Sequence, residues 1–286
     1  MKSKSLSLFI VMFIYIAAFG TGTVVLFAVS ALVHPLTALF IADIAATIIV
    51  FIFNLALCNA SIYDPYWSVQ PVFLIAMMYL HFGFSFQLKH LLVLIPLLLW
   101  SLRLTLNWAK GFENLEWEDW RYRKFKTENP KIAQFIVFTG IMMMPTILVF
   151  MGTIPFWYLL NAEKFPMILP AAGGLIILLG TVFEHLADTR MRRYKRNPGR
   201  GPYIDEGIWR HSRHPNYLGE ILIWTGLFVS GMVNFQLLSL PGVFLIILLF
   251  VFISAPMMER HILEKTPEYK NYQKTVPFLI FGPRRK

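Results

Sequence analysis

Long apolar runs recur along the whole of this 286-residue chain and constrain its fold more than any other feature. A helix needs about 20 consecutive apolar residues to cross the roughly 30 Å hydrocarbon core of a bilayer. Backbone amides in lipid must be hydrogen bonded within the spanning segment, which favours helices over open strands. We therefore predict an all-α, polytopic membrane protein with seven to eight transmembrane helices. The predicted segments are Leu6–Val29, Leu36–Cys58, Pro71–Phe86, Leu91–Trp108, Ile132–Leu160, Met167–Ala187, Asn216–Val233 and Leu237–Met257.

The composition supports the same fold class. Hydrophobic residues make up 57% of the chain and charged residues only 15%, which is more apolar surface than a soluble domain of this size buries. No polar stretch between the runs is long enough to form a separate soluble domain. We predict a single integral membrane domain over residues 1–286, with residues 184–286 as its motif-rich cytoplasmic half.

The distribution of Lys and Arg predicts the orientation, because positively charged loops stay on the cytoplasmic side of a membrane. Lys2, Lys4 and the segments 110–131, 190–213 and 260–286 hold 23 of the 26 basic residues. With eight spans, all 23 fall on one side. We therefore expect a multi-pass protein whose two termini and active-site opening are cytoplasmic. Topology and attraction to anionic lipids account for the net charge of +10, so it does not indicate a nucleic-acid partner.

Polar residues inside apolar segments mark candidate functional sites, because each costs a few kcal/mol in lipid unless it has a partner. Arg103 and Asn107 stand four residues apart in the fourth segment and share a helix face. Arg103 either binds an anion or extends its charge to the membrane surface. Glu184, Asp188 and Arg192 form a similar stripe in the sixth segment, which is either a ligand-binding face or a self-paired ladder of charges.

Small residues in the sixth segment predict a close helix contact. Gly173, Gly174 and Gly180 lie within an apolar helix, where glycine lets two backbones approach. Cys58 is the only cysteine, so an internal disulfide and a multi-thiolate metal site are excluded, and we expect it to pack in the interior.

The segment from Arg200 to Glu220 is dense in hydrogen-bond donors. Pro215 is suited to the first position of a helix, whose free amides bind anions. Arg213 and His214 precede this helix start, and Asn216 and Glu220 project from one of its faces, with Tyr217 beside them. This pattern predicts an anion-binding pocket. His211 and His214 lack acidic or thiol partners at ligand spacing, so we predict no metal.

A second polar group, Tyr63, Asp64 and Tyr66, lies between the second and third segments. Asp64 precedes a proline and either caps the next helix or acts as a buried acid. Burial keeps a carboxyl protonated, and such an acid polarises a substrate carbonyl. Asp64, Tyr63 and Tyr66 are therefore the candidate catalytic residues.

Five motifs in order resemble one known family. They are Tyr63–Ser68, Arg103–Trp108, Glu118–Tyr122, Glu184 with Asp188, and Ser212–Glu220. Together they resemble the DUF1295 branch of the steroid 5-alpha-reductase family, over about residues 40 to 280. The resemblance implies a steroid-reductase-like helical bundle that binds NADPH and reduces an activated carbon–carbon double bond of a lipid or steroid-like enone. The implied cofactor-binding residues are Arg103, Asn107, Asp119, Arg121, Tyr122, Asp188, Arg192, Arg213, His214, Asn216, Tyr217 and Glu220.

Two other functions remain open. The pattern from Arg213 to Gly219 also resembles membrane methyltransferases that use S-adenosylmethionine, such as the isoprenylcysteine carboxyl methyltransferases. NADPH carries phosphates, which guanidinium groups and helix N-termini bind well, whereas S-adenosylmethionine carries none. The arginines therefore favour NADPH. A lipid-binding protein without turnover is the third hypothesis. Steroid reductases carry a Gln-Glu pair where this chain has Tyr63 and Asp64, so the substrate half departs from that pattern.

Overall fold

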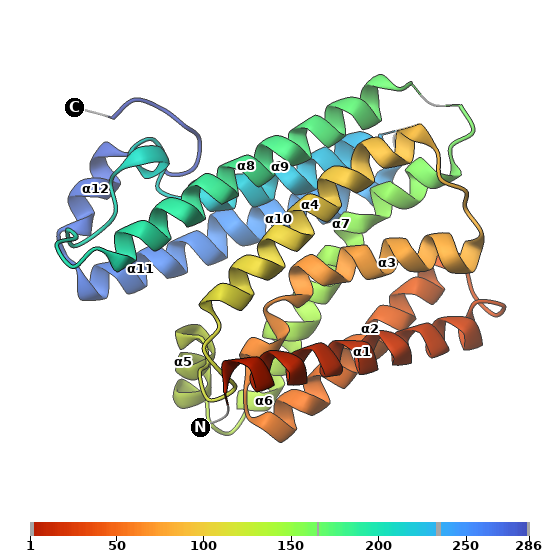
Figure 1. Ribbon diagram of the computed structural model, residues 1–286, viewed down its shortest axis with the longest axis horizontal. Coiled ribbons are helices and arrows are strands. Elements are labelled where there is room, and N and C mark those ends of the chain that lie inside the picture. The colour runs from red at the N-terminus through yellow and green to blue at the C-terminus, as the bar shows by residue number, and fades with distance from the viewer. Residues whose placement is uncertain (1–2, 165, 233–235, 285–286) are drawn as a thin grey trace. The chain divides into compact units, whose positions relative to one another are not determined.

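A computed structural model describes residues 3–164, 166–232 and 236–284, and in these residues the chain is helical without strands (Figure 1). Val233, at the end of the seventh predicted segment, lies outside the described residues, as do the basic residues Lys2, Arg285 and Lys286. The all-α prediction is confirmed.

Each predicted apolar segment forms a helix. Six of these helices are long and apolar enough to cross a membrane, which confirms a polytopic membrane protein. The other two, α3 and α9, have 17 and 16 residues, and their crossing of the bilayer stays a prediction. The six are α1 (Lys4–Val29), α2 (Pro35–Leu57), α4 (Leu88–Gly111), α8 (Ile168–Arg196) and the two composite helices Ala133–Asn161 and Leu237–Lys265.

The two composite helices each contain a π-helical stretch. The first consists of α6 (Ala133–Ile136), η2 (Val137–Met143) and α7 (Met144–Asn161). The second consists of η4 (Leu237–Ser239), α10 (Leu240–Leu248), η5 (Leu249–Ser254) and α11 (Ala255–Lys265). Short helices complete the fold: η1 (Ala60–Tyr63), α5 (Trp120–Glu128), η3 (Gly207–Arg210) and α12 (Tyr269–Thr275).

Helix α3 (Tyr66–Phe82) begins five residues before the predicted segment, which started at Pro71. Hydropathy alone missed this first turn because it contains Tyr66, Ser68 and Gln70. All three are fully buried and hydrogen bonded, so polar residues extend the helix inside the protein. The helix ends at Gly83, whose φ of 72° is left-handed and favours glycine.

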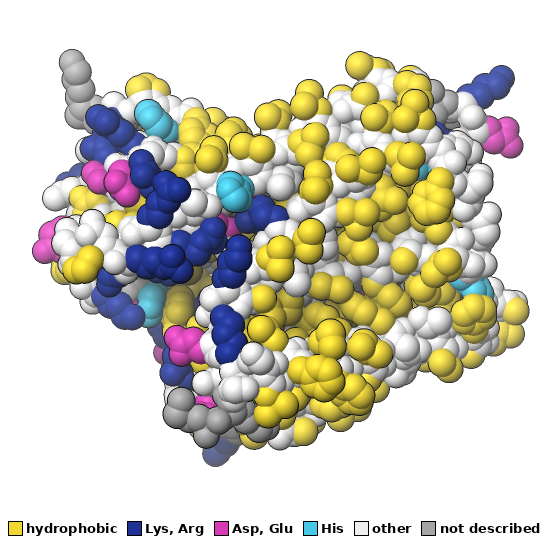
Figure 2. All heavy atoms as spheres, in the orientation of Figure 1, with side chains coloured by type: hydrophobic (Ala, Val, Ile, Leu, Met, Phe, Trp, Pro, Cys, Tyr) yellow, Lys and Arg dark blue, Asp and Glu magenta, His cyan; other side chains and the backbone are white. Residues whose placement is uncertain are grey.

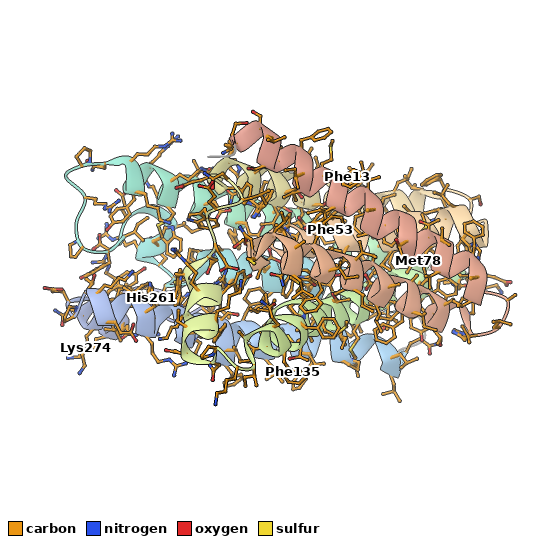
Figure 3. The ribbon with its side chains drawn as sticks, turned by 90° about the horizontal axis from the view of Figure 1, so that it is seen from below. Phe13, Phe53, Met78, Phe135, His261 and Lys274 are labelled. Atoms are coloured by element: carbon orange, nitrogen blue, oxygen red, sulfur yellow. The ribbon has the colours of Figure 1, made fainter. Side chains whose placement is uncertain are left out.

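The chain forms two compact units. The first comprises residues 1–87 and 101–160. In it α1 packs along α2, and a Cβ added at Gly22 would lie 3.0 Å from the carbonyl oxygen of Ala42. Figure 3 shows Phe13 of α1 and Phe53 of α2 at this contact, with their rings edge to face and 6.5 Å between centroids.

The second unit comprises residues 88–100 and 161–286, and the packing of α8 (Ile168–Arg196) against α9 (Pro215–Ser230) dominates it. Glycines make this contact possible. A Cβ on Gly173 would lie 2.5 Å from the Gly226 carbonyl oxygen, and one on Gly180 would lie 2.5 Å from that of Gly219. Gly174 approaches the backbone of Leu92 in the same way. The close contact predicted for the three glycines of α8 is confirmed.

The surface of α8 divides into an apolar and a basic part. Leu175, Leu179, Val182 and Leu186 repeat at helical spacing and are exposed, as expected for a face that meets lipid. Toward its C-terminal end the exposed side chains become basic, at Arg193, Lys195 and Arg196. Figure 2 shows Lys and Arg gathered over this end of the second unit, beside hydrophobic side chains.

One minor prediction is wrong. Cys58 is exposed instead of packed in the interior. It follows the last residue of α2 with a φ of 55°, which turns the chain out of the helix and directs the side chain away from the core.

Replacing Gly180 with alanine should destabilise the second unit. The added methyl group meets the Gly219 backbone, which cannot move without separating α8 from α9, so we expect a loss of about 1–3 kcal/mol in the free energy of unfolding. Thermal unfolding of detergent-purified protein measures this. Gly20→Ala is the control, because its Cβ would have nothing within 4 Å. Equal melting temperatures for the two variants would refute the close contact.

Candidate functional site

The second unit contains a cavity of about 410 Å³ at the basic end of α8 and the start of α9. Six segments form its wall: the end of α8, the loop around Ile204, η3, the first turn of α9 with the residues before it, α11 and α12. Its lining combines charged, amide and aromatic side chains. They are Asp188, Met191, Tyr194, Lys195, Pro202, Tyr203, Ile204, Trp209, Arg213, His214, Asn216, Tyr217, Met258, Ile262, Tyr269 and Tyr272.

A buried carboxylate organises one wall of this cavity. Oε1 of Glu259 on α11 lies 2.9 Å from Nε2 of His214 and 3.1 Å from Nε of Arg213. Its Oε2 accepts a hydrogen bond of 2.7 Å from Gln273 on α12. The guanidinium of Arg213 also donates from Nη1 to the carbonyl oxygen of Gln273 at 3.0 Å. Glu259 therefore holds two predicted cofactor residues in place and joins α11 to α12.

The C-terminal segment folds back over the residues that precede α9. The backbone amide of Arg213 donates to Pro277 at 3.0 Å, and the hydroxyl of Ser212 donates to Leu279 at 2.8 Å. The Tyr272 hydroxyl donates to the carbonyl oxygen of Trp209. The first turn of α9, which begins at Pro215 as predicted, is thus fixed from both sides.

Aromatic rings form another part of the wall. Tyr203 lies edge-to-face against Tyr269, with ring centroids 5.7 Å apart, and contacts Tyr272. Burial raises the pKa of both Tyr269 and Tyr272, so both remain neutral phenols. A smaller cavity of about 300 Å³ shares Tyr194 and Tyr203 with the first and is lined by two further arginines, Arg193 and Arg200. Flat faces beside cations suit a ligand that carries both planar rings and negative charge.

The structure brings five of the seven cofactor residues predicted in this unit to the cavity, and they are Asp188, Arg213, His214, Asn216 and Tyr217. Arg192 and Glu220 do not line it: Arg192 bonds Thr189 on its own helix, and Glu220 lies one turn further along α9. Glu259, Tyr269 and Tyr272 were not among the predicted site residues. Their pattern near the C-terminus fits the reductase and the methyltransferase families alike, so it did not separate the two predictions.

In the first unit, four predicted residues form an ionic cluster between η1 and α5. The hydroxyl of Tyr122 donates to Oδ1 of Asp64 at 2.5 Å, and Nε of Arg121 lies 2.8 Å from Oδ1 of Asp119. Asp119 also caps α5 by accepting from the amide of Arg121. Burial raises the pKa of Asp64 to about 7, although the Arg121 charge and the Tyr122 hydrogen bond act in the opposite direction. Asp64 is therefore a carboxyl that changes charge near neutral pH.

Buried hydrogen bonds fix the loop that carries this cluster. Asn59 donates to the carbonyl oxygens of Leu115 and Trp117 at 2.8 and 2.7 Å. Glu118 accepts from the amide of Ala60 at 2.7 Å, and Ser61 accepts from the amide of Asp119 at 2.8 Å. These hydrogen bonds hold the loop at residues 59–61 and the loop at residues 115–119 together as one rigid structure.

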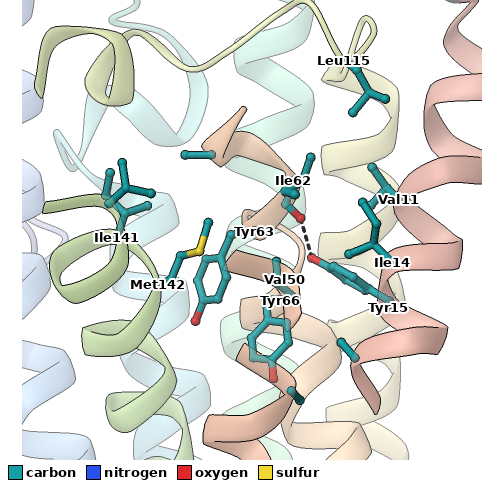
Figure 4. Close-up of a cluster of buried hydrophobic side chains, with 14 of the residues drawn as sticks. Val11, Ile14, Tyr15, Val50, Ile62, Tyr63, Tyr66, Leu115, Ile141 and Met142 are labelled. Atoms are coloured by element: carbon teal, nitrogen blue, oxygen red, sulfur yellow. Dashed lines mark hydrogen bonds between the residues drawn. The ribbon is translucent and has the colours of Figure 1, made fainter. Parts of the chain in front are cut away.

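The candidate catalytic residues Tyr63 and Tyr66 belong to a second network, and their rings lie in the buried hydrophobic cluster of the first unit (Figure 4). Their rings stack with centroids 4.9 Å apart, and both are almost fully buried. The Tyr66 hydroxyl lies 3.1 Å from Oδ1 of Asp43, and the Tyr63 hydroxyl lies 2.7 Å from the hydroxyl of Thr146. Asp43 is on α2 and Thr146 on α7. Sequence reasoning missed Asp43, although an acid in the middle of an apolar span is itself a signal.

Two further predicted residues, Arg103 and Asn107, lie on the C-terminal half of α4, one turn apart and half-buried. The eight site residues predicted in the first unit thus form three groups: the ionic cluster, the tyrosine network and this pair on α4.

The fold and the cavity define the class of this protein. It is an all-helical, multi-pass membrane protein with a cavity lined by aromatic and cationic side chains at the end of its apolar helices. The profile of the family described as "Protein of unknown function (DUF1295)" matches residues 50–276, and the chain belongs to this family. An uncharacterised protein of Schizosaccharomyces pombe is 28% identical over 254 residues, covering 76% of this chain and 71% of the yeast protein. No solved structure matches the chain.

Replacing Glu259 with alanine should destabilise the protein by about 3–5 kcal/mol, because it leaves Arg213 and His214 buried without their carboxylate. Thermal or denaturant unfolding in detergent measures the loss. Glu264→Ala, an exposed acid on the same helix, is the control and should change stability by less than about 0.5 kcal/mol. Similar losses of stability in both variants would mean that the buried Glu259 carboxylate does not stabilise the cavity wall.

The pKa of Asp64 predicts a pH dependence of stability. Its carboxyl titrates near 7 in the folded protein and near 3.8 in an unfolded chain, so the folded state binds more protons between these values. Its contribution to the free energy of unfolding is therefore present at acidic pH and falls as the pH rises toward and through 7. The asparagine of Asp64→Asn does not titrate, so the free energy of unfolding of this variant should not show this decrease with pH.

Melting temperatures at pH 5, 6, 7 and 8 test the Asp64 prediction. The difference between Asp64→Asn and wild type should grow in favour of the variant as the pH rises. Glu113→Gln, an exposed acid of the same unit, is the control. A difference that stays constant across the range would contradict the raised pKa.

Proposed function

We propose that this protein is a membrane reductase of the steroid 5-alpha-reductase type, which uses NADPH to reduce an activated carbon–carbon double bond of a lipid or steroid-like enone. The single observation that carries the proposal is the cavity of the second unit. Five residues predicted from the motif resemblance as cofactor contacts line this one space.

The side chains of the cavity suit a dinucleotide. Its volume of about 410 Å³ is within the usual range for small-molecule sites. Lys195 and Arg213 bring positive charge, and Arg193 and Arg200 do so in the adjoining cavity. Arg213 forms an ion pair with Glu259, and its Nη1 donates a hydrogen bond to the carbonyl oxygen of Gln273, so this arginine is a preorganised wall group. Tyr203, Tyr269 and Tyr272 offer faces for planar rings.

When bound, NADPH supplies a hydride to the substrate. Residues of this chain would bind and orient the cofactor and stabilise the charge that develops on the substrate. Asp188 and Asn216 would orient polar groups of the cofactor, and the basic side chains would hold its phosphates. Asp64, Tyr63 or Tyr66 would stabilise the charge that grows on the substrate carbonyl, because fixed donors in a dry site act strongly.

The exposed apolar faces of the helices support a lipid substrate, since a molecule dissolved in the bilayer reaches such a protein directly. The basic excess at the ends of the spans supports the predicted orientation, with the termini and the cavity opening in the cytoplasm, where NADPH is available.

Calorimetric titration of NADPH and of S-adenosylmethionine into detergent-purified protein tests the proposal. We expect NADPH to bind and Asn216→Ala to weaken its binding about tenfold, the effect of losing roughly one buried hydrogen bond. Asn271→Ala, an exposed asparagine that does not line the cavity, is the matched control.

Each alternative outcome has a distinct meaning. Binding of S-adenosylmethionine without NADPH would replace the proposal with methyl transfer. Binding of neither cofactor, together with measurable lipid affinity, would leave a lipid-binding protein without turnover. NADPH binding that is equal in Asn216→Ala and wild type would place the cofactor outside this cavity.

A further inference from the structure

The exposed apolar face of α8 leads along the helix to an arginine. This face consists of Leu175, Leu179, Val182 and Leu186, whose side chains are between 47% and 57% exposed. An α-helix makes one turn in about 3.6 residues, so Arg193, 18 residues after Leu175, lies about five full turns further along the same face. Arg193 is exposed as well. The face that meets lipid therefore ends in a guanidinium group.

The opposite face of α8 packs inside the second unit. Gly173 and Gly180 approach α9, and Asp188 and Lys195 line the first cavity. These four residues lie about half a turn around the helix from the apolar face. Arg193 is not among the residues that line the first cavity. It therefore points toward the surroundings of the protein, on the side of α8 that faces away from α9.

The length of α8 places Arg193 near the depth of lipid headgroups. The helix has 29 residues and is about 43 Å long, whereas the hydrocarbon core of a bilayer is about 30 Å thick. The charged C-terminal turns are the part that extends beyond the hydrocarbon. Arg193 follows Leu186 by seven residues, about 10 Å along the helix axis. This distance is enough to pass from the acyl chains of a lipid to its phosphate.

The cavity of about 300 Å³ lies beside Arg193. The loop after α8 contributes Asn197, Gly199, Arg200 and Gly201 to its lining. This loop is a tight turn: the side chain of Asn197 accepts from the amide of Gly199 at 3.0 Å, and its carbonyl oxygen accepts from the amide of Arg200 at 3.2 Å. The cavity thus has a defined shape at the end of the helix.

The two arginines of this cavity differ in their contacts. Nη1 of Arg200 donates to the carbonyl oxygen of Lys195 at 2.7 Å, and its guanidinium lies over the ring of Tyr194, 5.9 Å from the centroid. Arg193 has no hydrogen bond or ion pair within the residues that the structure describes. One guanidinium is therefore held in position, and the other is available to a ligand.

The two acids of the cavity are paired with other cations. Asp205 accepts from Arg284 at 2.9 Å, and Glu206 lies 3.8 Å from Arg190. Neither of these cations is among the residues that line the cavity. The two arginines of its lining therefore supply positive charge that the acids do not balance. Guanidinium groups form strong, directional hydrogen bonds with phosphate oxygens.

We propose that this cavity binds the phosphate of an anionic phospholipid whose acyl chains lie along the apolar face of α8. The site asks for a ligand with both negative charge and long apolar chains, because Arg193 continues the face of exposed leucines. Figure 2 shows Lys and Arg beside hydrophobic side chains at this end of the second unit. The proposal does not depend on the reductase function, since Lys195 and Arg213 remain the basic groups of the first cavity.

Native mass spectrometry of the detergent-purified full chain tests the proposal. Phosphatidylglycerol is the anionic probe and phosphatidylcholine the neutral one, and we expect the anionic lipid to bind more tightly. Arg193→Ala should weaken the binding of phosphatidylglycerol about tenfold, the effect of losing a hydrogen bond to a charged group. Single lipid molecules in detergent carry no membrane surface potential, so the general attraction of basic proteins to anionic bilayers does not contribute.

Arg196→Ala is the matched control. Arg196 is exposed on the same end of α8 and has the same charge, but it is not among the residues that line either cavity. Both variants should keep the melting temperature of wild type without lipid, because both side chains are at the surface. Equal weakening in the two variants would overturn the proposal, since the binding would then follow net charge instead of this cavity. Unchanged binding in Arg193→Ala would do the same.

Two competitors identify the source of the phosphate. Glycerophosphoglycerol is the headgroup of phosphatidylglycerol without its acyl chains, and NADPH carries phosphates without such chains, so neither should displace the lipid. Displacement by glycerophosphoglycerol would replace the proposal with a site for a soluble phosphate. Displacement by NADPH would assign the two arginines to the cofactor. A protein that binds the lipid but no NADPH would lose the proposed function and keep this site, so the two failures are distinguishable.

Discussion

The cost of an unpaired polar group in lipid governs this structure. A membrane helix satisfies its own backbone, so every polar side chain within it needs a partner from another element or a place at the surface. In the first unit, Asp43, Gln70 and Thr146 meet this demand together and join α2, α3 and α7 through hydrogen bonds. In the second unit, Glu259 does so for α9, α11 and α12. The polar networks thus also decide which helices pack together.

Glycine has the complementary role where no polar group is available. Lipid supplies no hydrophobic drive between helices, so close packing must bring the backbones together. Gly180 faces Gly219, and Gly173 faces Gly226, so the backbones of α8 and α9 approach each other closely at both positions. This contact places the basic end of α8 beside the first turn of α9, and the cavity lies at that junction.

Hydropathy was sufficient to predict the helices because burial in lipid needs only length and apolarity. It was insufficient at α3, whose first turn is polar yet buried, since the compensating partners lie more than twenty residues away in sequence. The same distance explains the omissions at the site. Nothing local in the sequence indicates that Glu259 meets His214, or that Asp43 meets Tyr66. Motif likeness identified the residues at the start of α9, whose role depends on local sequence, and missed the partners that hold them.

The two networks differ in what their charges permit. Glu259 has Arg213 and His214 beside it, so it remains a carboxylate and its effect is to hold side chains in fixed positions. Asp43 has no cation among its described partners, only the phenol of Tyr66 and the amide of Gln70, so its surroundings stabilise a charge far less than those of Glu259 do. The charge of Glu259 holds the side chains of the cavity wall in one arrangement. The two buried acids thus meet the same cost of burying charge in different ways, Glu259 with cationic partners and Asp43 with neutral ones.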